Sequence, residues 1–120
     1  MQLADDKVNI AGLQPVMQDA LPVIRKVFED YIGYATITSA FDKKHGNYSR
    51  HYVGLAVDMR TWTTQTSGIQ LSKTRKGILA ASLRKALGVS FYILVEDTHI
   101  HVAWKPNSVR EAQEALIRRS

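Results

Sequence analysis

All four histidines of this 120-residue chain fall into two short stretches that also carry acidic residues, 45–58 and 96–101. The chain has no cysteine, so it contains neither a thiolate metal site nor a disulfide framework. Histidine and carboxylate side chains at this density are typical of a metal centre that keeps one coordination position open. If both stretches contribute to one centre, the fold has to bring them together in space.

Length and composition predict a single domain over residues 1–120. With 45% apolar and 22% charged residues, the sequence is that of a folded, soluble chain rather than a disordered one. No run approaches the roughly 18 apolar residues of a membrane span. The first residues are polar and acidic, which differs from a secretory signal peptide. We therefore expect no membrane span, no signal peptide and synthesis in the cytoplasm.

The formal net charge is +5. A basic surface favours anionic partners, such as nucleic acid, acidic lipid or a cell-wall polymer. Most of the excess positive charge comes from 73–85 and from the last eleven residues, and solvated helix faces explain it better than a dedicated binding patch does. We expect no nucleic-acid partner, because a binding sheet would interleave aromatic with basic residues, whereas these basic residues lie on predicted helices.

The hydrophobic pattern predicts an α+β fold: a small, mostly antiparallel sheet with helices packed on one face. A helix is expected over 13–32, with Pro22 kinking or splitting it and Gly33 ending it. A second helix is expected from the Ser72 cap to 87, with Ile78 on its apolar side and Gly88 after it. The remaining expected elements are strands at 35–38, 55–60, 91–95 and 99–104, a turn at 96–98 and a final helix opening at Ser108.

His99 and His101 are spaced to share one face of a strand, because successive strand side chains alternate. One of them can then bind a metal while the other lies beside it. His51 and Asp58 are seven residues apart, about 23 Å in an extended chain. Shared coordination therefore requires a bend, which Gly54 allows. A hydrogen-bonded His51–Asp58 pair that orients a loop is the structural alternative.

Together these residues resemble a known family signature. The chain is similar to the zinc D-Ala-D-Ala carboxypeptidase-like peptidases, a group that includes murein endopeptidases, phage L-alanyl-D-glutamate endolysins and the hedgehog signalling domain. The resemblance covers about residues 13–104 and implies the fold of that group. It rests on the pattern Ser49-x-His51-x-x-Gly54-x-Ala56-x-Asp58 followed by His99-x-His101.

By position, the resemblance implies that His51, Asp58 and His101 bind one Zn²⁺ ion per chain. It also implies that His99 stabilises an oxyanion or positions the substrate. Ser49 and His45 would line the substrate cleft. Trp62 and Trp104 flank the proposed site, and we expect Trp104 to bind the substrate; packing in the core is the alternative for each tryptophan.

The general base is expected to be a carboxylate near the second histidine pair. Several relatives carry their acid three residues before the last zinc-binding histidine, and that place is Thr98 here. Glu96 is our preferred base because its longer side chain can reach from the turn. Asp97 is the alternative, since strand alternation places it on the face of His99.

The implied substrate is a peptidoglycan stem peptide. Many D,D-carboxypeptidases hold a terminal carboxylate with an arginine in a Ser-Gly-Tyr-Arg-like stretch, whereas this chain has an acidic residue at that place, in Ser39-Ala40-Phe41-Asp42. An endopeptidase is therefore favoured over a carboxypeptidase. The family suggests a phage or bacterial origin, with release through a holin or carriage in the virion, and we expect a monomer.

Two other functions use the same residues. A non-catalytic zinc-containing binding module of hedgehog-like fold, such as a virion attachment component, would retain the metal without the base. A non-haem iron oxygenase also uses two histidines and a carboxylate, but its ligands usually include a close His-x-Asp pair. The zinc peptidase is the leading hypothesis.

Overall fold

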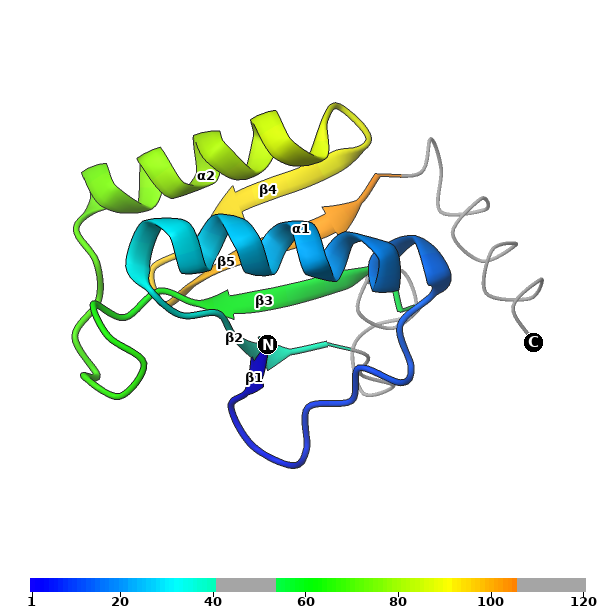
Figure 1. The fold of residues 1–120 in the computed structure, drawn as a ribbon, viewed down its shortest axis with the longest axis horizontal. Coiled ribbons are helices and arrows are strands. Elements are labelled where there is room, and N and C mark those ends of the chain that lie inside the picture. Colours follow the sequence, from blue (N-terminus) through cyan, green and yellow to red (C-terminus); the bar gives the residue numbers. More distant parts are fainter. Residues whose placement is uncertain (41–53, 106–120) are drawn as a thin grey trace.

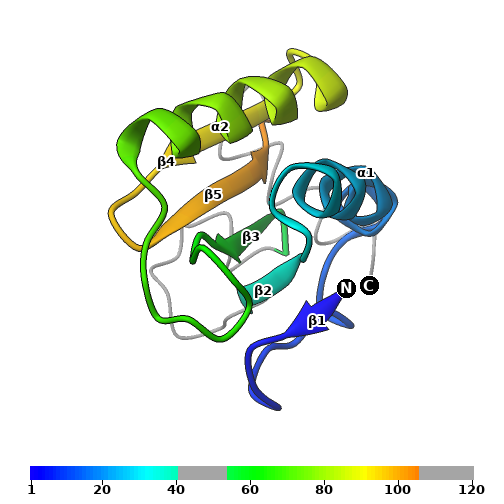
Figure 2. The same ribbon diagram turned by 60° about the vertical axis from the view of Figure 1, so that its left-hand side comes forward.

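The architecture is a five-stranded mixed sheet with two helices, seen in a computed structural model that describes residues 1–40 and 54–105 (Figure 1). The strand order across the sheet is β1-β2-β3-β5-β4. In Figures 1 and 2 both helices lie on the same side of the sheet. The elements are β1 (Gln2–Leu3), α1 (Pro15–Ile32), β2 (Thr36–Ser39), β3 (Ala56–Arg60), α2 (Lys73–Leu87), β4 (Phe91–Val95) and β5 (His99–Trp104).

The pairing confirms the α+β class and the largely antiparallel sheet. β2 with β3, β3 with β5, and β5 with β4 are antiparallel, while β1 adds a short parallel edge next to β2. In the β3–β5 register Asp58 lies opposite His101, and Arg60 lies opposite His99. The two histidine-bearing stretches of the sequence therefore meet through adjacent strands.

The sheet has one face in the core and one face that carries the polar residues. Val57, Met59, Ile100 and Val102 are fully buried and belong to one core cluster with the apolar side of the helices. The residues that alternate with them, including Asp58 and His101, project from the other face. We call this second face the open face.

Helix α1 is continuous from Pro15 to Ile32, so of the two predicted effects of Pro22, a kink or a split, the split is wrong. Proline removes one backbone donor, but buried residues lie on both sides of Pro22, including Met17 and Phe28. Their burial holds the two halves of the helix against the core. Gly33 ends the helix as predicted, at φ 83°, where its N–H donates to the Glu29 carbonyl at 3.0 Å.

Helix α2 begins and ends where the sequence predicts. Ser72 Oγ accepts from the Arg75 N–H at 3.2 Å, and Gly88 follows the last turn. One expectation fails, because Ile78 is 47% exposed instead of lying on the apolar side. Lys76 is buried instead, at 6% exposure. The helix expected from Ser108 lies outside the described residues.

Within the described residues, no helix is both long and apolar enough to cross a membrane.

Gly54 is a point of close backbone contact at the entrance to β3. Its φ is +75°, and its carbonyl accepts from the Gln14 N–H at 2.9 Å. A Cβ placed on Gly54 would lie 2.5 Å from the Gly12 carbonyl oxygen. The bend that the sequence predicted at this glycine is thus imposed both by a left-handed backbone and by a neighbouring chain segment.

We expect Gly54→Ala to lower the free energy of unfolding by about 2–5 kcal/mol, because it adds left-handed strain to a backbone clash. Gly77→Ala is the matched control, since Gly77 lies inside α2 and a Cβ there meets nothing within 4 Å. That control should stabilise the protein by roughly 0.5–1 kcal/mol. Urea denaturation of both variants measures the difference. Equal stability of Gly54→Ala and the wild type would contradict the close contact.

Candidate active site

Cross-strand rows on the open face organise the candidate site. In each row, residues from β3, β5 and β4 lie side by side, because neighbouring strands are about 4.8 Å apart. The Glu96 N–H donates to the His99 carbonyl at 2.8 Å, which extends the β4–β5 register into the turn. The rows are Ala56–Ala103–Tyr92, Asp58–His101–Leu94 and Arg60–His99–Glu96.

Asp58 lies between the two histidines of β5. Its Oδ1 atom is 2.8 Å from His101 Nδ1 and 3.7 Å from His99 Nε2. The side chains of Asp58, His101 and His99 are 16%, 20% and 29% exposed, so solvent or a ligand can reach a group that is otherwise held in place. The prediction that His99 and His101 share one face is confirmed.

Asp58 and His101 fit two positions of a zinc site. Zinc takes carboxylate oxygen and imidazole nitrogen at about 2.0–2.2 Å, so two such ligand atoms in a tetrahedral site lie about 3.3 Å apart. The Asp58 and His101 atoms, 2.8 Å apart, need only a small separation to reach that spacing. The third predicted ligand, His51, lies outside the described residues. Within 1–40 and 54–105 no group of three His, Cys, Asp or Glu is placed to hold a metal ion.

The same contact is also a hydrogen bond. At 2.8 Å, a protonated His101 Nδ1 donates to the Asp58 carboxylate with ordinary geometry. A proton and a metal ion therefore compete for this nitrogen, and metal binding releases the proton. The arrangement serves a metal centre or a purely structural pair, and a metal measurement separates the two.

Thr98 orients His99. The Thr98 hydroxyl lies 3.0 Å from His99 Nδ1. When that hydroxyl donates to Nδ1, the ring proton resides on Nε2, the nitrogen that faces Asp58. Sequence reasoning treated Thr98 only as the place of a missing acid. Because Thr98 directly precedes His99 in the sequence, this contact between the two side chains could have been predicted.

Two side chains from outside the sheet fix the 96–98 turn. Gln70 Nε2 donates to the Thr98 carbonyl at 3.2 Å, and Lys76 Nζ donates to the Asp97 carbonyl at 2.5 Å. Lys76 was expected to contribute to a solvated helix face, but it is buried beneath this turn. Buried polar groups of this kind are normally hydrogen-bonded, and here the bond ties α2 to the residues that precede His99.

The turn separates the two candidate bases. Glu96 lies in a row with His99, two residues after Leu94, whose side chain is on the open face. Asp97 lies at the tip of the turn, with its carbonyl bound to Lys76. The register therefore places the Glu96 backbone beside the histidine pair.

A shallow hollow of about 310 Å³ adjoins His101 and is lined by Tyr92, Leu94 and Ala103. Trp104, which was predicted to bind the substrate, is half-buried, packs against the core cluster and alternates with Ala103 on β5. Its packing is that of a core side chain. The predicted substrate-binding residues Ser49 and His45 lie outside the described residues.

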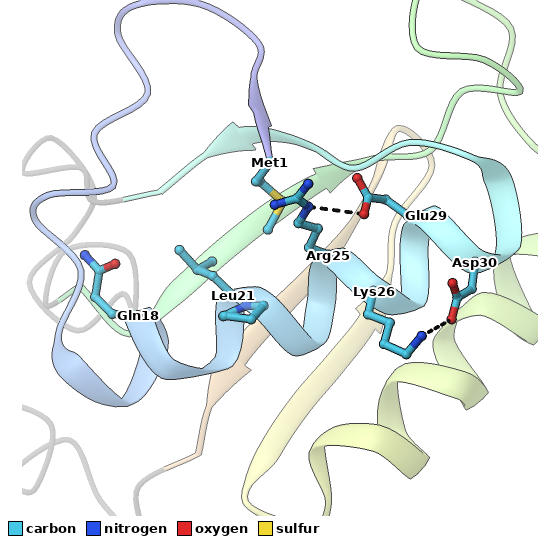
Figure 3. Close-up of a pocket in the computed structure, with 8 residues that line it drawn as sticks. Met1, Gln18, Leu21, Arg25, Lys26, Glu29 and Asp30 are labelled. Atoms are coloured by element: carbon cyan, nitrogen blue, oxygen red, sulfur yellow. Dashed lines mark hydrogen bonds and ion pairs between the residues drawn. The ribbon is translucent and has the colours of Figure 1, made fainter.

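A second cavity, of about 570 Å³, lies along α1 near Met1 (Figure 3). Its charged lining is already paired: Arg25 contacts Glu29 at 3.1 Å, and Lys26 contacts Asp30 at 3.0 Å. Exposed pairs of this kind contribute little energy. Because α1 covers the core face of the sheet, this cavity is separate from Asp58 and the histidines.

Comparison with known proteins gave no match to a protein-family model, a curated protein or a solved structure.

Proposed function

We propose that this protein is a zinc-dependent peptidase that cleaves peptide bonds within peptidoglycan stem peptides. The observation that supports it most is the placement of Asp58 between His101, at 2.8 Å, and His99, at 3.7 Å, on the open face. This is a convergent, partly accessible set of carboxylate and imidazole groups, as hydrolytic zinc sites require. The resemblance of the sequence motifs to zinc murein peptidases supports the same function.

In this proposal His51, Asp58 and His101 hold the metal ion. When bound there, a zinc ion would supply a Lewis acid for the scissile carbonyl and would lower the pKa of water at the site to around 7. Glu96 accepts the proton from the attacking water and returns it to the leaving amine. A backbone hydrogen bond from the Glu96 N–H to the His99 carbonyl, 2.8 Å long, fixes the Glu96 backbone next to His99, from where its side chain would reach the water.

His99 acts by donating a hydrogen bond. With Thr98 donating to Nδ1 at 3.0 Å, the Nε2–H group is available to the oxygen that gains negative charge as the carbonyl is attacked. A fixed donor of this kind stabilises the transition state more than the ground state. The Gln70 and Lys76 bonds to the turn hold this donor in place.

An endopeptidase fits the chain better than a carboxypeptidase, because the 39–42 segment has an acidic residue where a carboxylate-binding arginine would lie. The partner is then the peptide part of the cell wall. A phage or bacterial enzyme that reaches the wall through a holin, or that is carried in the virion, is the corresponding biological setting.

A zinc-containing binding module is the second candidate. It is favoured by Thr98, which occupies the acid position of several relatives and uses its side chain to contact His99 instead. Such a module would bind the metal and the wall without hydrolysis.

Digestion of purified sacculi, with and without a chelator, tests the proposal. We expect stem-peptide fragments, identified by mass spectrometry, to be released by the protein, to disappear with the chelator and to return when zinc is added. Release that continues in the chelator would contradict a metallopeptidase. Zinc binding without any release would favour the binding module.

A further inference from the structure

We propose that Arg60, stacked on Trp62, binds a carboxylate of the substrate beside His99. This inference rests on the proposed peptidase function and deepens it, since it assigns a specificity-determining residue. Arg60 lies directly opposite His99 in the β3–β5 register. It is two residues from Asp58 on the same strand, so both side chains project from the open face.

The Arg60 guanidinium is held in place before any ligand binds. Its central carbon lies 3.8 Å from the centroid of the Trp62 ring, and Nη1 donates to the Gln65 carbonyl at 3.2 Å. Stacking of this kind restricts the side chain, so less conformational entropy is lost when an anion binds.

Most of the hydrogen-bonding capacity of Arg60 is still available. Guanidinium has five N–H donors, and one of them serves Gln65. In the part of the chain that the structure describes, no carboxylate is paired with Arg60, whereas Arg25 on α1 contacts Glu29 at 3.1 Å. A planar cation with free donors next to a reaction centre is suited to a carboxylate.

The aromatic platform is itself anchored. The Tyr34 hydroxyl donates to the Trp62 carbonyl at 2.7 Å, and Trp62 forms a β-bridge with Gln70. Burial raises the pKa of Tyr34 above its usual value, so this donor stays protonated at neutral pH. Gln70 also binds the Thr98 carbonyl, which connects the Arg60 platform to the turn that positions His99.

The distribution of side chains on the open face gives the substrate a direction. The row with Arg60 and His99 lies at one end, and the hollow lined by Tyr92, Leu94, His101 and Ala103 lies at the other, where Lys105 Nζ is 5.1 Å from the centroid of the Tyr92 ring. Glu96, in the Arg60 row, is two strands away, about 10 Å, and does not neutralise the arginine. Because Arg60 lies opposite His99, a carboxylate bound by its guanidinium is expected on the Arg60 side of the scissile bond.

Two soluble stem peptides test the assignment: one with a free carboxylate on its acidic residue, and one with that group converted to a carboxamide. We expect the zinc-loaded wild type to cleave the acidic peptide with about 10- to 100-fold higher kcat/KM, the range for a charged hydrogen bond. Arg60→Gln should remove this preference, mainly through KM. Arg60→Lys should keep only part of it, because lysine lacks the planar donor set.

Arg75→Gln is the matched control. Arg75 also lies over an aromatic ring, 5.5 Å from the centroid of Tyr31, but on α2 at the other side of the sheet. The Arg75→Gln substitution removes the same charge as Arg60→Gln, and the variant protein should retain the preference for the acidic peptide. Circular dichroism should show the same fold for both glutamine variants.

Binding of the same two peptides to chelator-treated protein, measured by calorimetry, separates this inference from the peptidase proposal. The protein could bind the acidic peptide preferentially, in a way that depends on Arg60, and yet cleave neither peptide after zinc is added. That result would support the carboxylate site and would contradict the peptidase proposal. Cleavage by the wild type without any preference, or a preference that survives in Arg60→Gln, would overturn the assignment of Arg60.

Discussion

Asp58→Ala is expected to abolish both zinc binding and wall hydrolysis. Asp58 Oδ1 is the atom on which His101 and His99 converge, at 2.8 and 3.7 Å, and removing it takes away one of three proposed ligands. A zinc site that loses a ligand also loses the geometry of its open position. Hydrolysis of sacculi should fall to the level measured with chelator, and the zinc content of the variant should fall with it.

Asp30→Ala is the control for this substitution. Asp30 is on α1 in an exposed ion pair with Lys26 at 3.0 Å, so its loss removes the same charge far from the site. We expect full zinc content, full hydrolysis and a change in stability within about 1 kcal/mol. If Asp58→Ala kept its zinc, the assignment of Asp58 as a ligand would be wrong. If the wild type contained no zinc and Asp58→Ala only lowered the free energy of unfolding, the Asp58–His101 contact would be a structural hydrogen bond.

Glu96→Gln is expected to keep the metal and lose activity. The substitution preserves the size of the side chain and the backbone bond from Glu96 to His99, 2.8 Å long, but an amide cannot accept the proton from water. General acid–base catalysis contributes about 10²- to 10⁴-fold, so kcat on a soluble stem peptide should fall by that factor with zinc content unchanged. Steady-state kinetics and metal analysis of the same preparation measure both quantities.

Asp97→Asn is the matched control, because it changes a neighbouring carboxylate at the tip of the same turn. The Lys76 bond is made to the Asp97 backbone carbonyl and should survive the change. We expect nearly wild-type kcat for Asp97→Asn. The reverse result, with an active Glu96→Gln and an inactive Asp97→Asn, would transfer the role of the base to Asp97.

The two helices and four of the five strands were predictable because their sequences carry strong local signals. Periodic apolar residues predict α1 and α2, and the caps at Ser72, Gly33 and Gly88 mark where they begin or end. Strand β1 was not predicted, since Gln2–Leu3 has only two exposed residues. It forms through tertiary contacts, with the Gln2 and Ala4 N–H groups donating to the carbonyls of Ala35 and Ile37.

The site was predictable only in part, for a similar reason. Alternation along a strand placed His99 and His101 on one face, but the pairing of Asp58 with His101 is a long-range register that no local pattern encodes. The same holds for Lys76, whose burial under the 96–98 turn depends on how α2 packs against the sheet. Arg60 and Trp62 are neighbours in sequence, yet their relation to His99 follows only from the strand register.

The zinc content of the purified wild-type protein, measured by elemental analysis beside Asp58→Ala, tests the central claim most directly. We predict about one zinc ion per wild-type chain and almost none in the variant, as a site with a dedicated ligand set requires. Absence of metal from the wild type, even after incubation with zinc and removal of the excess, would contradict the proposed metal centre and the peptidase that depends on it.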